Sequence, residues 1–175
     1  MKRKGAIWVS AVLYIAVGTI VISILLASAL PLVEKIKDRN SFVQAKELML
    51  ILDETIRTVA TEGPGSQREL SPLTIKAGQM IISQDEDKVI WSMDTKAKLM
   101  EPNIVIKEGV LSLQLKTTQV SGKYLMTVET SYRNVYDVTL NSRYQPPYTG
   151  TYNLVVKNTG VFTQQNRPTI ELKVI

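Results

Sequence analysis

Residues 6–33, AIWVSAVLYIAVGTIVISILLASALPLV, decide the architecture of this chain. The stretch runs for 28 residues without a charged side chain, whereas a helix needs only about 20 apolar residues to cross a bilayer. Lys2, Arg3 and Lys4 stand just before it. Because basic residues that flank a span stay on the cytoplasmic side, the sequence predicts a single-pass membrane protein with a cytoplasmic N-terminus and an extracellular C-terminal domain.

A cleaved secretory signal peptide is the competing interpretation of this stretch. The apolar region of such a peptide runs for only about 7 to 15 residues and ends in a small-residue cleavage site. Ala27-Ser28-Ala29 has the composition of such a site. The apolar run before it is already long enough to span a membrane, so we expect the segment to be retained.

Small residues recur along one side of the apolar segment. Thr19, Ser23 and Ala27 follow one another at every fourth position, and such a stripe lets a second helix approach closely. Pro31 comes four residues later and predicts a bend, because its ring removes a backbone hydrogen bond. These four residues form the expected helix-packing surface.

A second, amphipathic helical pattern covers residues 34–62. Its apolar positions recur in steps of three and four, which is the spacing of one helix face. The residues expected to pack this helix on the outer domain are Phe42, Ala45, Met49, Leu52, Ile56 and Val59. Leu48 and Ile51 widen the stripe, and Asp53 is expected among the charged residues of the opposite face.

The two helical patterns join without a helix breaker between residues 34 and 41. Gly63-Pro64-Gly65 supplies the stop, because a glycine ends a helix readily and a proline cannot continue it. We therefore expect one helix over residues 6–62. The alternative is a membrane span that ends at Leu30, followed by a separate helix.

Residues 66–175 carry short β-rich runs separated by turns. Residues 80–82 and 89–91 flank Asp85-Glu86-Asp87, which predicts a hairpin with an acidic tip. The further predicted strands are 104–106, 110–115, 124–130, 135–140, 152–156 and 169–175. The sequence thus predicts an α+β protein in which a long helix precedes an antiparallel, sandwich-like β-domain.

The composition excludes several classes of function. The chain has no histidine and no cysteine, which excludes His-based acid–base chemistry, Cys nucleophiles, disulfides and the usual zinc sites. Its net charge is +5, but without Lys2, Arg3 and Lys4 the balance is 18 basic to 16 acidic residues. The positive charge is therefore mostly a topogenic signal, and we expect no nucleic-acid binding.

Three clusters in the β-domain have the composition of possible sites. Asp85-Glu86-Asp87 offers oxygens to calcium but lacks the spaced pattern of a loop site. Tyr144-Gln145-Pro146-Pro147-Tyr148 suits a docking loop or a merely stiffened surface loop. Glu101, Glu108 and Glu129 could supply a carboxylate pair for glycoside hydrolysis, but their spacing fixes no geometry. The sequence therefore predicts no enzyme, no metal and no cofactor.

The junction Lys2-Arg3-Lys4-Gly5 before Ala6 resembles the class III signal peptide of archaeal type IV pilins. The resemblance implies that a prepilin-type peptidase cuts after Gly5 and that residues 1–5 are removed. The apolar segment then begins the mature subunit and forms the core of a filament. Bacterial members carry a glutamate at the position of Ser10, and archaeal members commonly lack this glutamate. At this position the chain therefore resembles the archaeal branch.

The resemblance implies a structural subunit of a cell-surface filament that serves adhesion or surface attachment. Its partners would be further copies of itself, packed through the N-terminal helix, together with the membrane and the peptidase. Two alternatives stay open. One is a non-polymerising, signal-anchored protein whose β-domain binds a ligand, and the other is a minor or accessory pilin.

Overall fold

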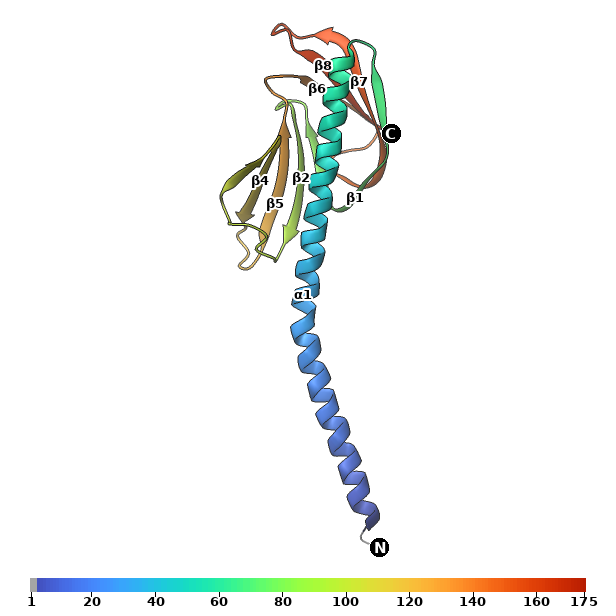
Figure 1. Ribbon diagram of the computed structural model, residues 1–175, viewed down its shortest axis with the longest axis vertical. Helices are drawn as coiled ribbons and strands as arrows, with labels where there is room; N and C mark the ends of the chain where they lie inside the picture. Colours follow the sequence, from blue (N-terminus) through green and yellow to red (C-terminus); the bar gives the residue numbers. More distant parts are fainter. Residues whose placement is uncertain (1–2) are drawn as a thin grey trace. The chain divides into compact units, whose positions relative to one another are not determined.

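The computed structural model describes residues 3–175, with side chains from Trp8 onward. It opens on a single helix, α1 (Arg3–Glu62), drawn in blue and teal in Figure 1. Leu30 and Pro31 both lie inside α1. The described chain therefore has one continuous helix here, and not a span that ends at Leu30 followed by a second helix. The chain divides into two compact units, Met1–Lys37 and Asp38–Ile175, and each is considered by itself below.

The first unit holds the apolar part of α1. α1 is the one helix in the described chain that is long and apolar enough to cross a membrane. Its large side chains, such as Leu13, Ile20 and Leu26, are exposed. A helix that is apolar on every side needs lipid or other helices around it. The segment is therefore compatible with a single-pass membrane anchor.

The second unit holds the rest of α1 and one mixed sheet of eight strands (Figure 1). The strands are β1 (Gln67–Ser83), β2 (Lys88–Thr95), β3 (Val105–Glu108), β4 (Leu111–Thr117), β5 (Tyr124–Ser131), β6 (Asp137–Ser142), β7 (Tyr148–Phe162) and β8 (Pro168–Val174). Their order across the sheet is β3-β4-β5-β2-β1-β7-β8-β6. The predicted hairpin is confirmed, because β1 pairs antiparallel with β2 through Ile82 and Val89.

The expected antiparallel sandwich is wrong in two respects. The strands form one curled sheet rather than two packed sheets, because the apolar stripe of α1, and not a second sheet, closes the core. In addition, β6 pairs parallel with β8, from Asp137 opposite Thr169 to Ser142 opposite Val174. The α+β class and the order of helix before sheet stand as expected.

The end of α1 fixes where the sheet begins. Gly63 takes a left-handed φ of 93°, the conformation that commonly ends a helix. The Ser66 hydroxyl donates to the carbonyl oxygens of Val59 at 2.6 Å and Gly63 at 2.7 Å. Two carbonyl groups at the end of the helix thereby find a partner, and the chain passes directly into β1.

Candidate functional surfaces

The predicted processing site lies at the start of the chain. Lys2 falls outside the described residues, while Arg3, Lys4, Gly5 and Ala6 lie in the first turn and a half of α1. The backbone there is helical and continuous with the apolar segment. A peptidase would have to reach this end of the helix to cut after Gly5.

The predicted helix-packing stripe lies on an exposed side of α1. The Thr19 hydroxyl donates to the Ile15 carbonyl at 2.8 Å, and the Ser23 hydroxyl donates to the Thr19 carbonyl at 2.8 Å. Ala27 and Pro31 are exposed. Because each hydroxyl is satisfied within the helix, the stripe offers a close-approach surface with no stranded donor in an apolar surrounding.

The predicted helix-to-sheet stripe lies in the core of the second unit. Ala45, Met49, Leu52, Ile56 and Val59 are buried, with exposed fractions of 6% or less, and Phe42 packs against the same cluster while partly buried. Leu48 is also partly buried. Ile51, which was expected to widen the stripe, is instead 53% exposed.

Asp53 was expected on the solvent face of α1, and this was wrong. Its side chain is buried, and Oδ2 accepts a hydrogen bond from Arg57 Nε at 2.7 Å. That hydrogen bond raises the pKa of the Arg57 guanidinium. Within the described part of the chain, neither Asp53 Oδ1 nor the Tyr132 hydroxyl meets a partner with hydrogen-bond geometry. Helical spacing cannot reveal the burial of Asp53, because that burial depends on the position of Tyr132, which lies in a loop distant in sequence.

The Tyr132 phenol makes the second unit sensitive to alkali. Burial, and secondly the Asp53 charge, raise its pKa above the ordinary value of about 10. The folded state therefore favours the neutral phenol. The contribution of the buried phenol to the free energy of unfolding is fully present below the pKa of tyrosine in the unfolded chain. It falls above about pH 10, by up to about 1.4 kcal/mol per pH unit.

Replacing Tyr132 with phenylalanine should remove this alkaline loss, so the variant's stability should decline less between about pH 10 and 12 than that of the parent. The measurement is urea unfolding of the full chain in detergent, followed by Trp91 fluorescence with Trp8 replaced by phenylalanine. Tyr144→Phe is the matched control, because Tyr144 is 49% exposed. An equal alkaline slope in Tyr132→Phe and the parent would contradict the assignment.

Two of the three acidic side chains at the tip are solvated, and the third is buried. Asp85 and Glu86 are exposed, but Asp87 is buried and takes a left-handed φ of 50°. Its Oδ1 accepts from the Val138 N–H at 2.9 Å, and its Oδ2 accepts from Arg167 Nη1 at 2.8 Å. Among the described residues no group of three acidic, His or Cys side chains is placed to hold a metal.

The tyrosine-rich segment is only partly a surface loop. Tyr148 is fully buried at the start of β7, whereas Tyr144 is half exposed. Both rings meet Tyr152 edge-on, at centroid distances of 5.6 and 5.2 Å. The segment is therefore anchored in the core by one tyrosine, and only its first part is available for docking.

Each of the three glutamates considered for glycoside chemistry pairs with a lysine. Glu101 pairs with Lys98. Glu108 pairs with Lys46 of α1. Glu129 pairs with Lys88, at 3.1 Å, and the Glu129 and Glu86 carboxylates raise the pKa of the Lys88 ammonium. Each of the three carboxylates is thus paired with a cation, and Glu129 shares Lys88 with Glu86.

Two further surfaces were missed by sequence reasoning. The first, here called the β3 surface, consists of the exposed apolar residues Ile104, Val105, Ile106 and Val110. All four side chains of β3 itself are exposed, so this strand buries neither face. The signal in the sequence was the unbroken run Ile104-Val105-Ile106, which does not alternate as a half-buried strand would.

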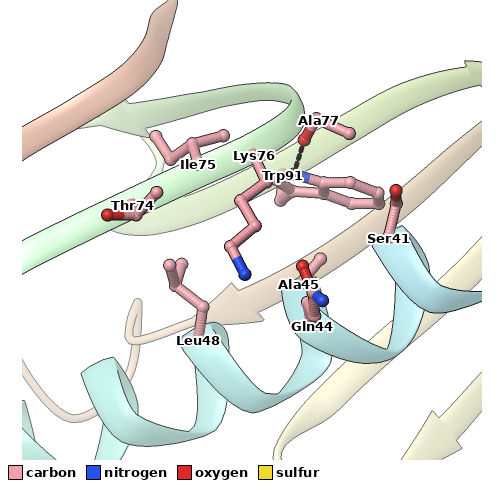
Figure 2. A pocket seen from close by; sticks show the side chains of 9 residues that line it. All are labelled: Ser41, Gln44, Ala45, Leu48, Thr74, Ile75, Lys76, Ala77 and Trp91. Atoms are coloured by element: carbon pink, nitrogen blue, oxygen red, sulfur yellow. Dashed lines mark hydrogen bonds between the residues drawn. The ribbon is translucent and has the colours of Figure 1, made fainter.

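The second surface, here called the β1 groove, lies between α1 and β1 and measures about 560 Å³. It is lined by Gln44, Glu47, Leu48, Ile51, Glu69, Leu70, Ser71, Pro72, Leu73, Thr74 and Lys76. Figure 2 shows the adjoining small hollow, where Leu48 and Lys76 extend from facing elements and the Trp91 indole donates to the Ala77 carbonyl at 2.9 Å. No local pattern reveals this groove, because its walls are about 25 residues apart in sequence.

Comparison with protein-family models, curated proteins and solved structures finds no match for this chain.

Proposed function

We propose that this chain is a pilin-like structural subunit of an archaeal cell-surface filament, used for adhesion or surface attachment. A peptidase of the prepilin type would cut it after Gly5, and the subunit would assemble through its apolar helix. The observation that carries the proposal is the uncharged segment 6–33, which follows Lys2, Arg3 and Lys4 directly and leads through one helix into a sheet domain.

The physical argument concerns the environments open to the apolar segment. Its large side chains, such as Trp8, Ile15 and Leu25, are exposed in the described chain. An apolar rod of this kind is stable in lipid or in a bundle of identical rods. Removal of the three cations would free one end to leave the membrane, since charged residues resist entry into an apolar core. The sheet domains would then cover the outside of the bundle.

The experiment is to identify the N-terminal residue of the protein by mass spectrometry, in membranes and in material sheared from the cell surface. A chain that begins at Ala6 and is recovered in the sheared fraction supports a filament subunit. A chain that keeps Lys2 and stays in the membrane would instead make it an anchored protein whose sheet domain binds a partner. A low copy number within fibres built of another subunit would identify a minor pilin.

Replacing Gly5 with leucine should block the cut, because the proposed processing requires a small residue before the cleaved bond. The uncut variant is expected to be lost from the sheared fraction and to accumulate in membranes. Gly5→Ala is the matched control, since alanine at the same position is also small and should leave the cut in place. Sheared fibres built of uncut Gly5→Leu chains would contradict the proposed processing.

A further inference from the structure

The second unit leaves one end of its sheet open. β3 is the outermost strand and, among the described residues, pairs with β4 alone, from Val105 opposite Gln114 to Glu108 opposite Leu111. Ile104, Val105 and Ile106 are 51%, 54% and 41% exposed. An apolar strand with a free edge is a ready surface for pairing with another chain.

The opposite end of the sheet is closed. The Val138 N–H of β6 donates to Asp87 Oδ1 at 2.9 Å, and the Leu140 N–H donates to Gln84 Oε1 at 3.0 Å. Side chains of the β1–β2 turn therefore occupy backbone groups that a further strand would need. A copy of β3 could not add to β6 without displacing these bonds.

A second unpaired strand edge lines the β1 groove. β1 pairs with β7 from Gln67 to Ile75 and again at Met80, but it pairs with β2 only from Gln79 to Ser83. Along the first half of β1 the edge away from β7 therefore has no strand beside it in the described chain. Leu48 and Ile51 of α1 contribute apolar side chains to the facing wall of the groove, beside the polar Gln44 and Glu47.

The β3 surface and the β1 groove flank opposite sides of the buried stripe of α1. Lys46 donates to both carboxylate oxygens of Glu108, at 2.6 and 2.7 Å, which fixes β3 beside that side of the helix. Gln44 and Leu48 line the groove and stand two positions from Lys46, about 200° around the helix. Two different surfaces on opposite sides can join copies head to tail, and such contacts build open-ended assemblies.

The charges of the two surfaces are complementary. The groove carries the carboxylates of Glu47 and Glu69 and a single ammonium, that of Lys76. The exposed cation of β3 is Lys107, which sits between the apolar residue Ile106 and the already paired Glu108. A β3 strand that enters the groove would bring one positive charge to a surface whose net charge is negative. Opposite charges at a contact favour the correct partner and register.

We propose that the β3 surface of one copy docks into the β1 groove of the next copy, with Lys107 directed to Glu69. This inference rests on the proposed filament function and specifies the contact between neighbouring sheet domains. Apolar side chains from Ile104 to Ile106 would cover Leu48 and Ile51, and the free edge of β3 would lie along the unpaired half of β1. The resulting contact repeats in one direction along an assembly.

The absence of cysteine in the chain allows a direct test. Two full-length variants, Lys107→Cys and Glu69→Cys, are produced together in the same cells, and sheared fibres are treated with a short cross-linker that has a maleimide at each end. The linker is needed because a direct disulfide requires Cβ atoms about 3.5 to 4.5 Å apart, and the Cβ atoms of a lysine–glutamate ion pair are farther apart than that. We expect a cross-linked dimer when both variants are present, severalfold more abundant than in fibres made of either variant alone.

Lys123→Cys paired with Glu69→Cys is the matched control, because Lys123 is an exposed lysine in the turn between β4 and β5. Fibres that form normally but show no Lys107–Glu69 cross-link overturn this contact while leaving the filament function intact. Cross-linking of Lys107→Cys alone also overturns it, because that result requires β3 to meet β3. An uncut, membrane-bound chain that forms no fibres overturns the filament function and this contact together.

Discussion

Replacing Gly78 with alanine is expected to destabilise the second unit by about 2 to 5 kcal/mol. Gly78 has a left-handed φ of 74°, which costs a residue with a Cβ about 1 to 2 kcal/mol. A Cβ there would lie 2.4 Å from the Ser92 carbonyl oxygen and 2.9 Å from the Trp91 ring. Both neighbours belong to the paired strand β2, and forcing such an overlap costs about 1 to 3 kcal/mol more.

The matched control is Gly122→Ala. Gly122 has a φ of 76°, nearly the same as Gly78, but a Cβ at Gly122 meets nothing within 4 Å. The control should therefore lose only the backbone part, about 1 to 2 kcal/mol. Urea unfolding of the full chain in detergent, followed by Trp91 fluorescence in the Trp8→Phe background, measures both. If the two variants lost the same free energy of unfolding, the close approach of Gly78 to Trp91 would make no contribution to stability.

The result matters because Gly78 fixes the geometry beside the β1 groove. Trp91 is 2% exposed, and its indole N–H donates to the Ala77 carbonyl. The register of β1 against β7 shifts between Ile75 and Met80, and β1 gains β2 as a second neighbour from Gln79 onward. A glycine at this point lets the strand pass over the indole ring, and the groove opens where the strand leaves β2.

The elements of this fold could be predicted from sequence because their signals are local. The alternation in residues 110–115 placed β4, in which Leu111, Leu113 and Leu115 are buried. The three-and-four spacing placed the buried stripe of α1 in the same way. The first half of β1 was missed, since Arg68, Glu69 and Pro72 do not suggest a strand. Hydrogen bonding to β7 holds this segment in a strand that its own residue propensities do not favour.

The arrangement of the strands could not be predicted, because it depends on contacts between distant residues. β6 and β8 share the parallel register Val138 opposite Ile170, and nothing within either segment distinguishes a parallel from an antiparallel neighbour. The two candidate docking surfaces have the same origin. The groove exists because β1 pairs with β2 over only five residue positions, from Gln79 to Ser83, and a turn sequence does not reveal where pairing stops.

Asp87 is the clearest case of a residue whose role only the fold defines. The Asp87 carbonyl accepts from the Tyr132 N–H at 2.7 Å, in addition to the two bonds that its carboxylate accepts. Arg167 also donates to the carbonyl groups of Arg133 and Tyr136. The β1–β2 turn, the loop before β6 and the start of β8 are thereby tied together at one carboxylate.

Replacing Asp87 with asparagine is expected to cost about 3 kcal/mol. Asparagine tolerates the left-handed backbone nearly as well as aspartate, so the measured loss reports the removal of the carboxylate charge and not backbone strain. It leaves the Arg167 guanidinium, whose side chain is only 17% exposed, without its nearest counter-charge, and breaking a buried pair in this way typically costs about 3 to 5 kcal/mol. The lower end applies because Asp137 Oδ1 lies 3.9 Å from Arg167 Nη2 and retains part of the attraction.

Asp85→Asn is the matched control, since Asp85 lies in the same turn but is exposed, and it should change the free energy of unfolding by less than about 0.5 kcal/mol. The same urea titration compares the two variants. Asp87→Asn should also weaken the cap on the Val138 N–H and so leave β6 less protected from pairing with other chains. Hydrogen exchange at Val138 is therefore expected to accelerate in Asp87→Asn and not in Asp85→Asn. A stable Asp87→Asn protein with unchanged exchange at Val138 would mean that the closed edge of the sheet does not depend on this carboxylate.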